Sequence, residues 1–214
     1  MITPSDATKK TREVAALAPI VPVLVIDDAT QARPLAEALI AGGLPALEVT
    51  LRTPAALDAI RAMAEVPGGV VGAGTLVTPQ DVRAAKATGA SFGVCPGATP
   101  ALRAACEAED LPLLPGASTV TEAMALLEAG YDFLKFFPAE ASGGVAALKA
   151  IGAPLPQIAF CPTGGVSPAN AADYLSLPNV LCAGGSWVAP KDRLAAGDWA
   201  GIETLARDAA KLER

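Results

Sequence analysis

A lysine stands in the middle of an apolar run, residues 133–137 (FLKFF), in a chain that has no histidine. An ordinary lysine amine is almost entirely protonated at neutral pH, and burial favours its neutral form. A neutral amine attacks carbonyl carbons and forms Schiff bases. Lys135 is therefore a candidate nucleophile, unless the strand ends there and the flexible stem carries the ammonium group to solvent.

A carboxylate in a second strand-like run, residues 46–51 (ALEVTL), could serve that lysine. The two-residue period of a strand places Glu48, Thr50 and Arg52 on one face and the apolar residues between them on the other. If the apolar face packs on helices, Glu48 and Arg52 point inward, where charges are costly unless paired or functional. In that case Glu48 and Arg52 form a buried ion pair, or Glu48 is the general acid/base beside Lys135. If the sheet is open, this polar face meets water and neither role is required.

Two glycine pairs provide backbone groups for an anion. Gly164-Gly165 follows the run 158–163, and Gly184-Gly185-Ser186 stands at the end of the run 180–185. Backbone N–H groups without side chains in the way can cradle a phosphate, and in many α/β barrels the phosphate site follows the last two strands. Tight turns also require glycine. Thr75 and Thr163, at the ends of two further runs, add hydroxyl groups that bind substrate or cap a turn.

The elements that carry these residues follow a regular order. Short apolar runs alternate with alanine-rich segments, which is typical of a parallel sheet with crossover helices. The eight runs, at about 27 residues per unit, fit a single (β/α)₈ TIM-barrel domain of class α/β over residues 1–214, with a short helix before the first strand. The predicted strands are 20–26, 46–51, 70–75, 92–96, 111–115, 133–137, 158–163 and 180–185.

A doubly wound open sheet is the competing architecture. Gly72-Ala73-Gly74 follows a predicted strand, but valine stands three residues beyond Gly74, where a dinucleotide-binding fingerprint needs glycine. Hydroxyl-proline pairs predict helix starts at Thr53, Thr78, Thr99 and Ser167, and glycines predict helix ends near positions 43, 89 and 130.

Composition narrows the class of protein. The chain carries 16 Lys+Arg against 22 Asp+Glu, a net charge of −6, and has no basic cluster that could follow nucleic acid. The longest apolar run, residues 15–26, contains two prolines and is too short for a membrane span. No signal peptide is recognised, so we expect a cytoplasmic protein. Four scattered cysteines and no histidine predict buried reduced thiols, no metal site and no cofactor.

Four segments resemble 2-keto-3-deoxy-6-phosphogluconate aldolases in sequence, order and spacing. They are residues 47–53 (LEVTLRT), 72–75 (GAGT), 135–140 (KFFPAE) and 161–165 (CPTGG), and the resemblance runs from about residue 19 to residue 190. It implies a metal-free class I aldolase with a TIM barrel, a homotrimer of the Entner-Doudoroff pathway. Such a lyase cleaves its keto-acid sugar phosphate to pyruvate and glyceraldehyde 3-phosphate, and often also acts on 4-hydroxy-2-oxoglutarate.

The resemblance also assigns roles. It makes Lys135 the Schiff-base lysine and Glu48 the general acid/base. The expected substrate-binding residues are Arg52 and Thr75 for the pyruvyl carboxylate, Pro96, Phe137 and Thr163 for the pocket wall, and Gly164, Gly165, Gly185 and Ser186 for the phosphate.

One departure and two alternatives accompany these roles. Asp27-Asp28 occupies the end of the first strand, where many relatives have a basic residue, so the balance of the phosphate charge is open. The related phosphogalactonate aldolases usually have asparagine in place of Arg52. A non-catalytic sugar-phosphate binding barrel explains the glycine pairs but not an interior lysine beside an interior glutamate.

Overall fold

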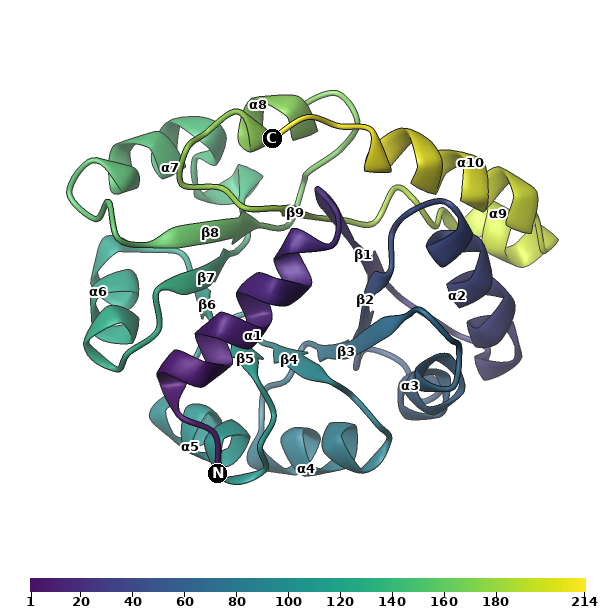
Figure 1. Cartoon of the computed structure of the whole chain (residues 1–214), viewed down its shortest axis with the longest axis horizontal. Helices are drawn as coiled ribbons and strands as arrows, with labels where there is room; N and C mark the ends of the chain where they lie inside the picture. Colours follow the sequence, from purple (N-terminus) through teal and green to yellow (C-terminus); the bar gives the residue numbers. More distant parts are fainter.

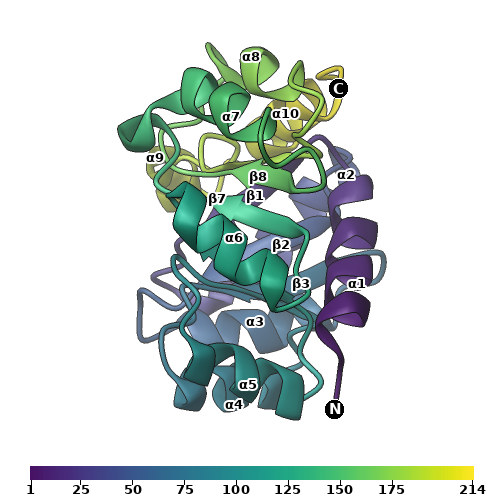
Figure 2. The ribbon, with the colours of Figure 1, turned by 90° about the vertical axis from the view of Figure 1, so that its left-hand side faces the viewer.

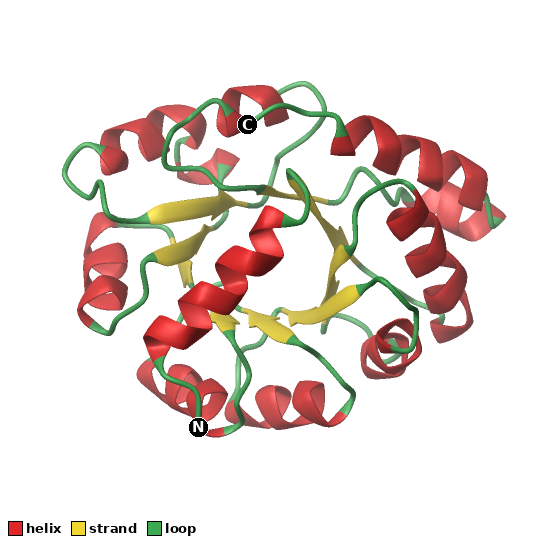
Figure 3. Ribbon diagram, in the orientation of Figure 1, coloured by secondary structure: helices red, strands yellow, loops and turns green.

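The computed structural model describes residues 1–214, in which all paired strands run parallel and helices surround them (Figures 1 and 3). One sheet has the order β5-β4-β3-β2-β1-β9 and the other β6-β7-β8. The predicted α/β class is confirmed. A strand forms within each of the eight predicted runs: β1 Ile20–Leu24, β2 Ala46–Thr50, β3 Val70–Gly74, β4 Phe92–Val94, β5 Leu113–Leu114, β7 Phe133–Phe136, β8 Ala159–Pro162 and β9 Ala183–Gly185. A ninth short strand, β6 Gly116–Ala117, follows the fifth run and was not predicted.

The two sheets meet at Pro115 and at the β8–β9 side. Pro115 has no N–H for a strand ladder and separates β5, which pairs with β4, from β6, which pairs with β7. Its carbonyl accepts a 2.8 Å hydrogen bond from the Lys135 N–H. On the other side, parallel bridges join Phe160 to Val180 and Thr163 to Gly184. The strand that carries Lys135 is thus held by neighbours on both edges.

The helices form the outer layer, and a large apolar core fills the space between them and the strands. Leu47 and Val49 lie in this outer core, as the alternation in β2 predicts. The helices are α1 Pro4–Ala16, α2 Ala32–Ala41, α3 Ala56–Ala64, α4 Pro79–Ala87, α5 Pro100–Ala108, α6 Val120–Glu128, α7 Gly144–Gly152, α8 Ala171–Leu175, α9 Lys191–Ala196 and α10 Trp199–Ala210, with 3₁₀ turns η1 Ala29–Gln31 and η2 Glu140–Ser142.

A smaller core of ten buried residues lies inside the ring of strands, and α1 covers one end of it. Thr11, Val14 and Ala15 of α1 line a small internal space together with Val21 and Phe133, which lie at the amino ends of β1 and β7. Turned by 90°, α1 is seen along one face of the molecule (Figure 2). The carboxyl ends of the strands are therefore the open ends. None of the helices is both long and apolar enough to cross a membrane.

The predicted helix boundaries are partly right. The hydroxyls of Thr78 and Thr99 accept N–H groups at the starts of α4 and α5, as predicted. The prediction for Thr53 is wrong, because its hydroxyl donates to the Ile26 carbonyl and α3 begins only at Ala56. The prediction for Ser167 is also wrong, because its N–H donates to the side chain of Asn170 and α8 starts after that residue. The predicted left-handed glycines are present at positions 43, 89 and 130.

Candidate active site

The only two charged side chains that the structure buries lie against each other. Lys135 Nζ is 3.2 Å from Glu48 Oε1, and the two residues are 5% and 3% exposed. Glu48 therefore pairs with Lys135 and not with Arg52. The Glu48 carboxylate lies directly over the α-carbon of Gly74, where an added Cβ would be 2.2 Å from Oε1. A side chain at position 74 would displace the carboxylate.

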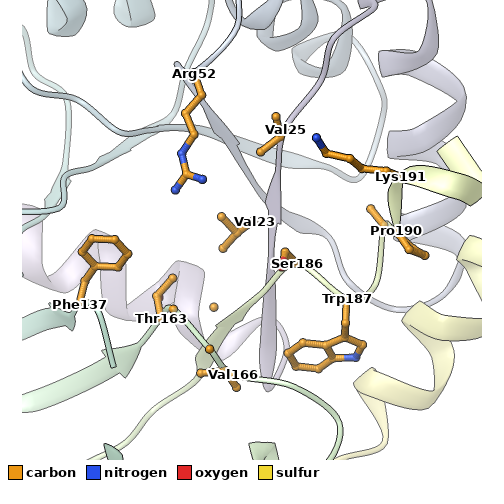
Figure 4. A pocket seen from close by; sticks show the side chains of 14 residues that line it. Val23, Val25, Arg52, Phe137, Thr163, Val166, Ser186, Trp187, Pro190 and Lys191 are labelled. Atoms are coloured by element: carbon orange, nitrogen blue, oxygen red, sulfur yellow. The ribbon is translucent and has the colours of Figure 1, made fainter. Parts of the chain in front are cut away.

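A cavity of about 470 Å³ lies at the carboxyl ends of the strands, and neither Lys135 nor Glu48 is among the residues that line it. Phe137 connects the Lys135 amine to this cavity, because the Phe137 ring lines the cavity and its centroid is 5.3 Å from Lys135 Nζ. Figure 4 shows Arg52 reaching into this space from the side opposite Phe137 and Thr163. Six of the residues predicted to bind substrate line the cavity: Arg52, Phe137, Thr163, Gly164, Gly165 and Ser186.

The glycine loop after β8 has a backbone suited to anions. Gly164 and Gly165 have φ angles of +99° and +84°, a left-handed conformation that side chains disfavour. The N–H groups of Gly164, Gly165 and Val166 donate to no acceptor within the chain. Three consecutive unpaired N–H groups beside a cavity can receive phosphate oxygens.

Three residues predicted for substrate binding do not line this cavity. Gly185 is covered by the Trp187 ring. Its neighbour Gly184 lines the cavity instead and packs on Thr163. The two glycines differ because successive strand residues face opposite sides of the sheet. Pro96 packs on Gly116 and lines a separate surface cavity.

Thr75 is the third residue outside the cavity lining. It lies at the end of β3 with a φ of +62°, next to the glycine that contacts Glu48. A left-handed threonine is uncommon and marks a constrained backbone. The constraint fixes the end of the strand that supports the carboxylate.

The charged side chains that line the cavity are basic, Arg52 and Lys191, and the acidic pair at the end of the first strand, Asp27 and Asp28, is not among them. Asp28 accepts the backbone N–H and the hydroxyl of Thr30, and these bonds hold the pKa of its carboxyl below the usual range. Lys191, which was not among the predicted site residues, lines the cavity and forms no ion pair. Its position shortly after the Gly184-Gly185-Ser186 loop is the signal that could have identified it.

The cysteines beside the site are buried free thiols. Burial raises the pKa of Cys95 to about 11, so this thiol stays protonated at neutral pH. Cys161 pairs in register with Lys135 across β7 and β8, and its Sγ lies 3.9 Å from Thr163 Oγ1. The Lys135 amine and the Glu48 carboxylate are therefore the groups of this site best suited to nucleophilic attack and proton transfer.

A family model described as KDPG and KHG aldolase matches residues 11–205. The chain belongs to the KDPG and KHG aldolase family. The resemblance noted in the sequence is thus confirmed, and the chain is an aldolase, a kind of lyase. A 2-dehydro-3-deoxy-phosphogluconate aldolase of Pseudoalteromonas atlantica is 55% identical over 199 residues, which cover 92% of this chain and 93% of the relative.

Two solved structures of aldolases are similar throughout. The 2-keto-3-deoxy-6-phosphogluconate aldolase of Zymomonas mobilis ZM4 with 3-phosphoglycerate has a TM-score of 0.93 and 47% identity, and the match covers 97% of this chain and 98% of that one. The KDPG aldolase of Legionella pneumophila, with pyruvate captured as a covalent carbinolamine intermediate, has a TM-score of 0.91 and 44% identity, covering 94% and 98%.

Proposed function

We propose that this chain is a class I aldolase that cleaves 2-keto-3-deoxy-6-phosphogluconate to pyruvate and glyceraldehyde 3-phosphate. On the same site it also cleaves 4-hydroxy-2-oxoglutarate to pyruvate and glyoxylate. The observation that carries the proposal is the buried pair of Lys135 and Glu48, 3.2 Å apart. The amine is 5.3 Å from the ring centroid of Phe137, which lines the same cavity as the glycine loop.

The reaction begins at the Lys135 amine. Glu48 accepts its hydrogen bond and is placed to take its proton, which leaves a neutral nucleophile. Attack on the C2 carbonyl gives a carbinolamine. Glu48 returns its proton to the carbinolamine hydroxyl, which leaves as water and gives an iminium, and the Glu48 carboxylate is free again. The iminium withdraws the electron pair of the C3–C4 bond as that bond breaks, so no metal or cofactor is required as electron sink.

Proton transfers complete the reaction. Glu48 takes the proton of the C4 hydroxyl as the aldehyde leaves, and later returns a proton to C3 of the enamine. Water then releases pyruvate from Lys135. Glu48 is the only buried carboxylate of the chain, which makes it the available carrier for both transfers.

The rest of the cavity binds the two ends of the substrate. Arg52, with Thr75 nearby at the end of β3, binds the pyruvyl carboxylate, and Phe137 and Thr163 shape the wall. Gly164, Gly165 and Ser186 bind the phosphate through backbone N–H groups and a hydroxyl, and the predicted role of Gly185 is dropped because the Trp187 ring covers it. Lys191 lines the same cavity and supplies a positive charge that the acids after β1 do not.

The proposal extends to the whole chain. Residues 1–214 form one domain in which β5 and β6 act as one strand of a closed (β/α)₈ barrel, a reading that the bridges between the β8 and β9 segments support. We further propose a cytoplasmic homotrimer of the Entner-Doudoroff pathway, with no nucleic acid or membrane partner. In sedimentation, such an assembly has three times the 21.4 kDa mass of one chain.

The assay that tests the proposal compares the two substrates. Cleavage of the phosphorylated keto acid should persist in EDTA and should have a much higher kcat/KM than cleavage of the same sugar acid without phosphate, because binding of the remote group stabilises the transition state. Equal efficiency on both would contradict the phosphate site. A preference for the galactonate epimer would instead identify a phosphogalactonate aldolase, and no turnover would favour a binding protein.

A further inference from the structure

A buried tyrosine and a glutamate connect the loop after β7 to helix α8. The Tyr174 hydroxyl donates to Glu140 Oε1, and Tyr174 is fully buried. Glu140 begins η2, only five residues after Lys135 in the chain. Neither residue lines the active-site cavity, so the pair has no direct contact that would bind substrate.

The same glutamate lies against the glycine loop. Its side chain covers the α-carbon of Gly165, where an added Cβ would be 2.5 Å from Glu140 Cγ. Its N–H donates to the Gly164 carbonyl at 3.0 Å, and the Ala139 N–H donates to the Thr163 carbonyl at 2.8 Å. The segment after β7 therefore holds the loop along one side.

Helix α8 holds the other side of the loop. Asn170, which precedes α8, donates from Nδ2 to the Gly165 carbonyl at 3.2 Å and accepts the Ser167 N–H at 2.8 Å. The loop carbonyls are thus paired, while the N–H groups of Gly164, Gly165 and Val166 remain unpaired. Such an arrangement orients the peptide groups before any anion arrives, which lowers the cost of binding.

We propose that Glu140 and Tyr174 are positioning residues that fix the Gly164–Val166 N–H groups for the substrate phosphate. The inference rests on the proposed function and deepens it. Because Glu140 lies only four residues after the end of β7, the strand of Lys135, the pair also sets the distance between the phosphate and the carbonyl that the amine attacks. The phosphate then aligns C2 with Lys135, and a substrate without phosphate gains nothing from the pair.

Kinetics of Tyr174→Phe and Glu140→Ala test this. In both variants we expect KM for the phosphorylated substrate to rise about tenfold, less than the roughly 100-fold that a 1 Å misplacement can cost. Kinetic constants for 4-hydroxy-2-oxoglutarate should stay within about twofold of wild type, since it has no phosphate. Glu140→Gln should restore most of the lost affinity, because its amide oxygen still accepts the hydroxyl.

The chain offers a matched control. Tyr131 is the other fully buried tyrosine, and its hydroxyl donates to Glu107 at 3.1 Å, near the amino end of β7. Tyr131→Phe also loses one hydrogen bond to a glutamate, so it should lower Tm in the same way as Tyr174→Phe without changing KM for either substrate. The effects of Tyr174→Phe and Glu140→Ala should not add, because the two residues act as one unit.

A measurement without turnover separates this inference from the proposed function. Inorganic phosphate should raise the Tm of the wild type and of Tyr131→Phe more than that of Tyr174→Phe. If the wild type cleaves neither substrate, the aldolase proposal fails, while the phosphate measurement still tests the pair. An equal KM change for both substrates, an equal effect of Tyr131→Phe, or an unchanged phosphate response in Tyr174→Phe would overturn the inference.

Discussion

Lys135 and Glu48 form a pair that stability alone does not explain. Removing two charges from water costs several kcal/mol per ion, and well-packed apolar residues often replace buried ion pairs without loss of stability. The inner core around the pair already consists of apolar residues from several strands. A charged pair at this one place therefore indicates chemistry.

Glu48→Gln should separate proton transfer from binding. The amide keeps the shape of the carboxylate but takes no proton from the C4 hydroxyl and returns none to the enamine. Cleavage and the exchange of pyruvate methyl protons with deuterated water should both fall by about 10² to 10⁴. NMR of the methyl signal measures the exchange directly.

Thermal unfolding of the same variant is the control. If Glu48 only neutralises Lys135, Glu48→Gln should lose stability and keep its exchange rate in the protein that still folds. Wild-type exchange in folded Glu48→Gln would mean that a different group or a water carries the proton.

At the level of elements, β3 sets the position of the Glu48 carboxylate, because Gly74 in this strand has no side chain that would displace it. Gly74→Ala should push Glu48 away from Nζ, because the new Cβ would lie 2.2 Å from its Oε1. We expect kcat to fall by about 10²-fold, as for other small displacements of catalytic groups. Steady-state kinetics on the phosphorylated substrate measure this.

Gly93→Ala in β4 is the matched control. Its Cβ would meet Leu76 Cδ1 at 2.6 Å, the mobile end of a side chain in the outer core. This variant should lose stability but keep kcat near wild type. Similar kinetics in the two alanine variants would show that the position of Glu48 is not set by β3.

Helix α6 gives an element-scale prediction for pH. Glu122 accepts the backbone N–H groups of Ser118 and Thr119 at 2.8 and 2.9 Å, and the Ser118 bond is the main reason why its pKa is lowered. A lowered folded-state pKa gives stability that is present above the unfolded pKa of about 4.3 and is lost as pH falls through the folded value.

Glu122→Gln should therefore have a lower Tm than wild type at neutral pH, and the difference should shrink below about pH 4. Calorimetric scans across this range measure it. A Tm difference that stays constant down to the lowest pH would mean that the negative charge of Glu122 does not stabilise the start of α6.

For the whole molecule, the sequence predicted what depends on local pattern. Alternation in the runs around Glu48 and Lys135 placed both side chains inside, and every predicted strand formed. The end of β5 before Pro115 agrees with the missing N–H of proline, but the short strand β6 beyond it was not predicted. The failure of the Thr53 cap could not be predicted either, because the hydroxyl bonds to the distant Ile26 carbonyl, a partner that only the folded chain brings close.

Part of the site also depended on long-range packing. Which glycine of the pair 184–185 faces the cavity follows from strand register, and Lys191 enters the cavity only because α9 lies beside it. The role of Glu140 could not be read from its exposed helix-turn position, since Tyr174 and Gly165 contact it from other segments.

The central claim is that the fold selects one lysine of the chain's seven, the only one it buries, as the nucleophile. Borohydride reduction in the presence of pyruvate, followed by peptide mass mapping, tests this most directly. We predict loss of activity and one reduced pyruvyl group, located on Lys135, with none on the exposed Lys149 or Lys191. No adduct, or an adduct on another lysine, would contradict the account.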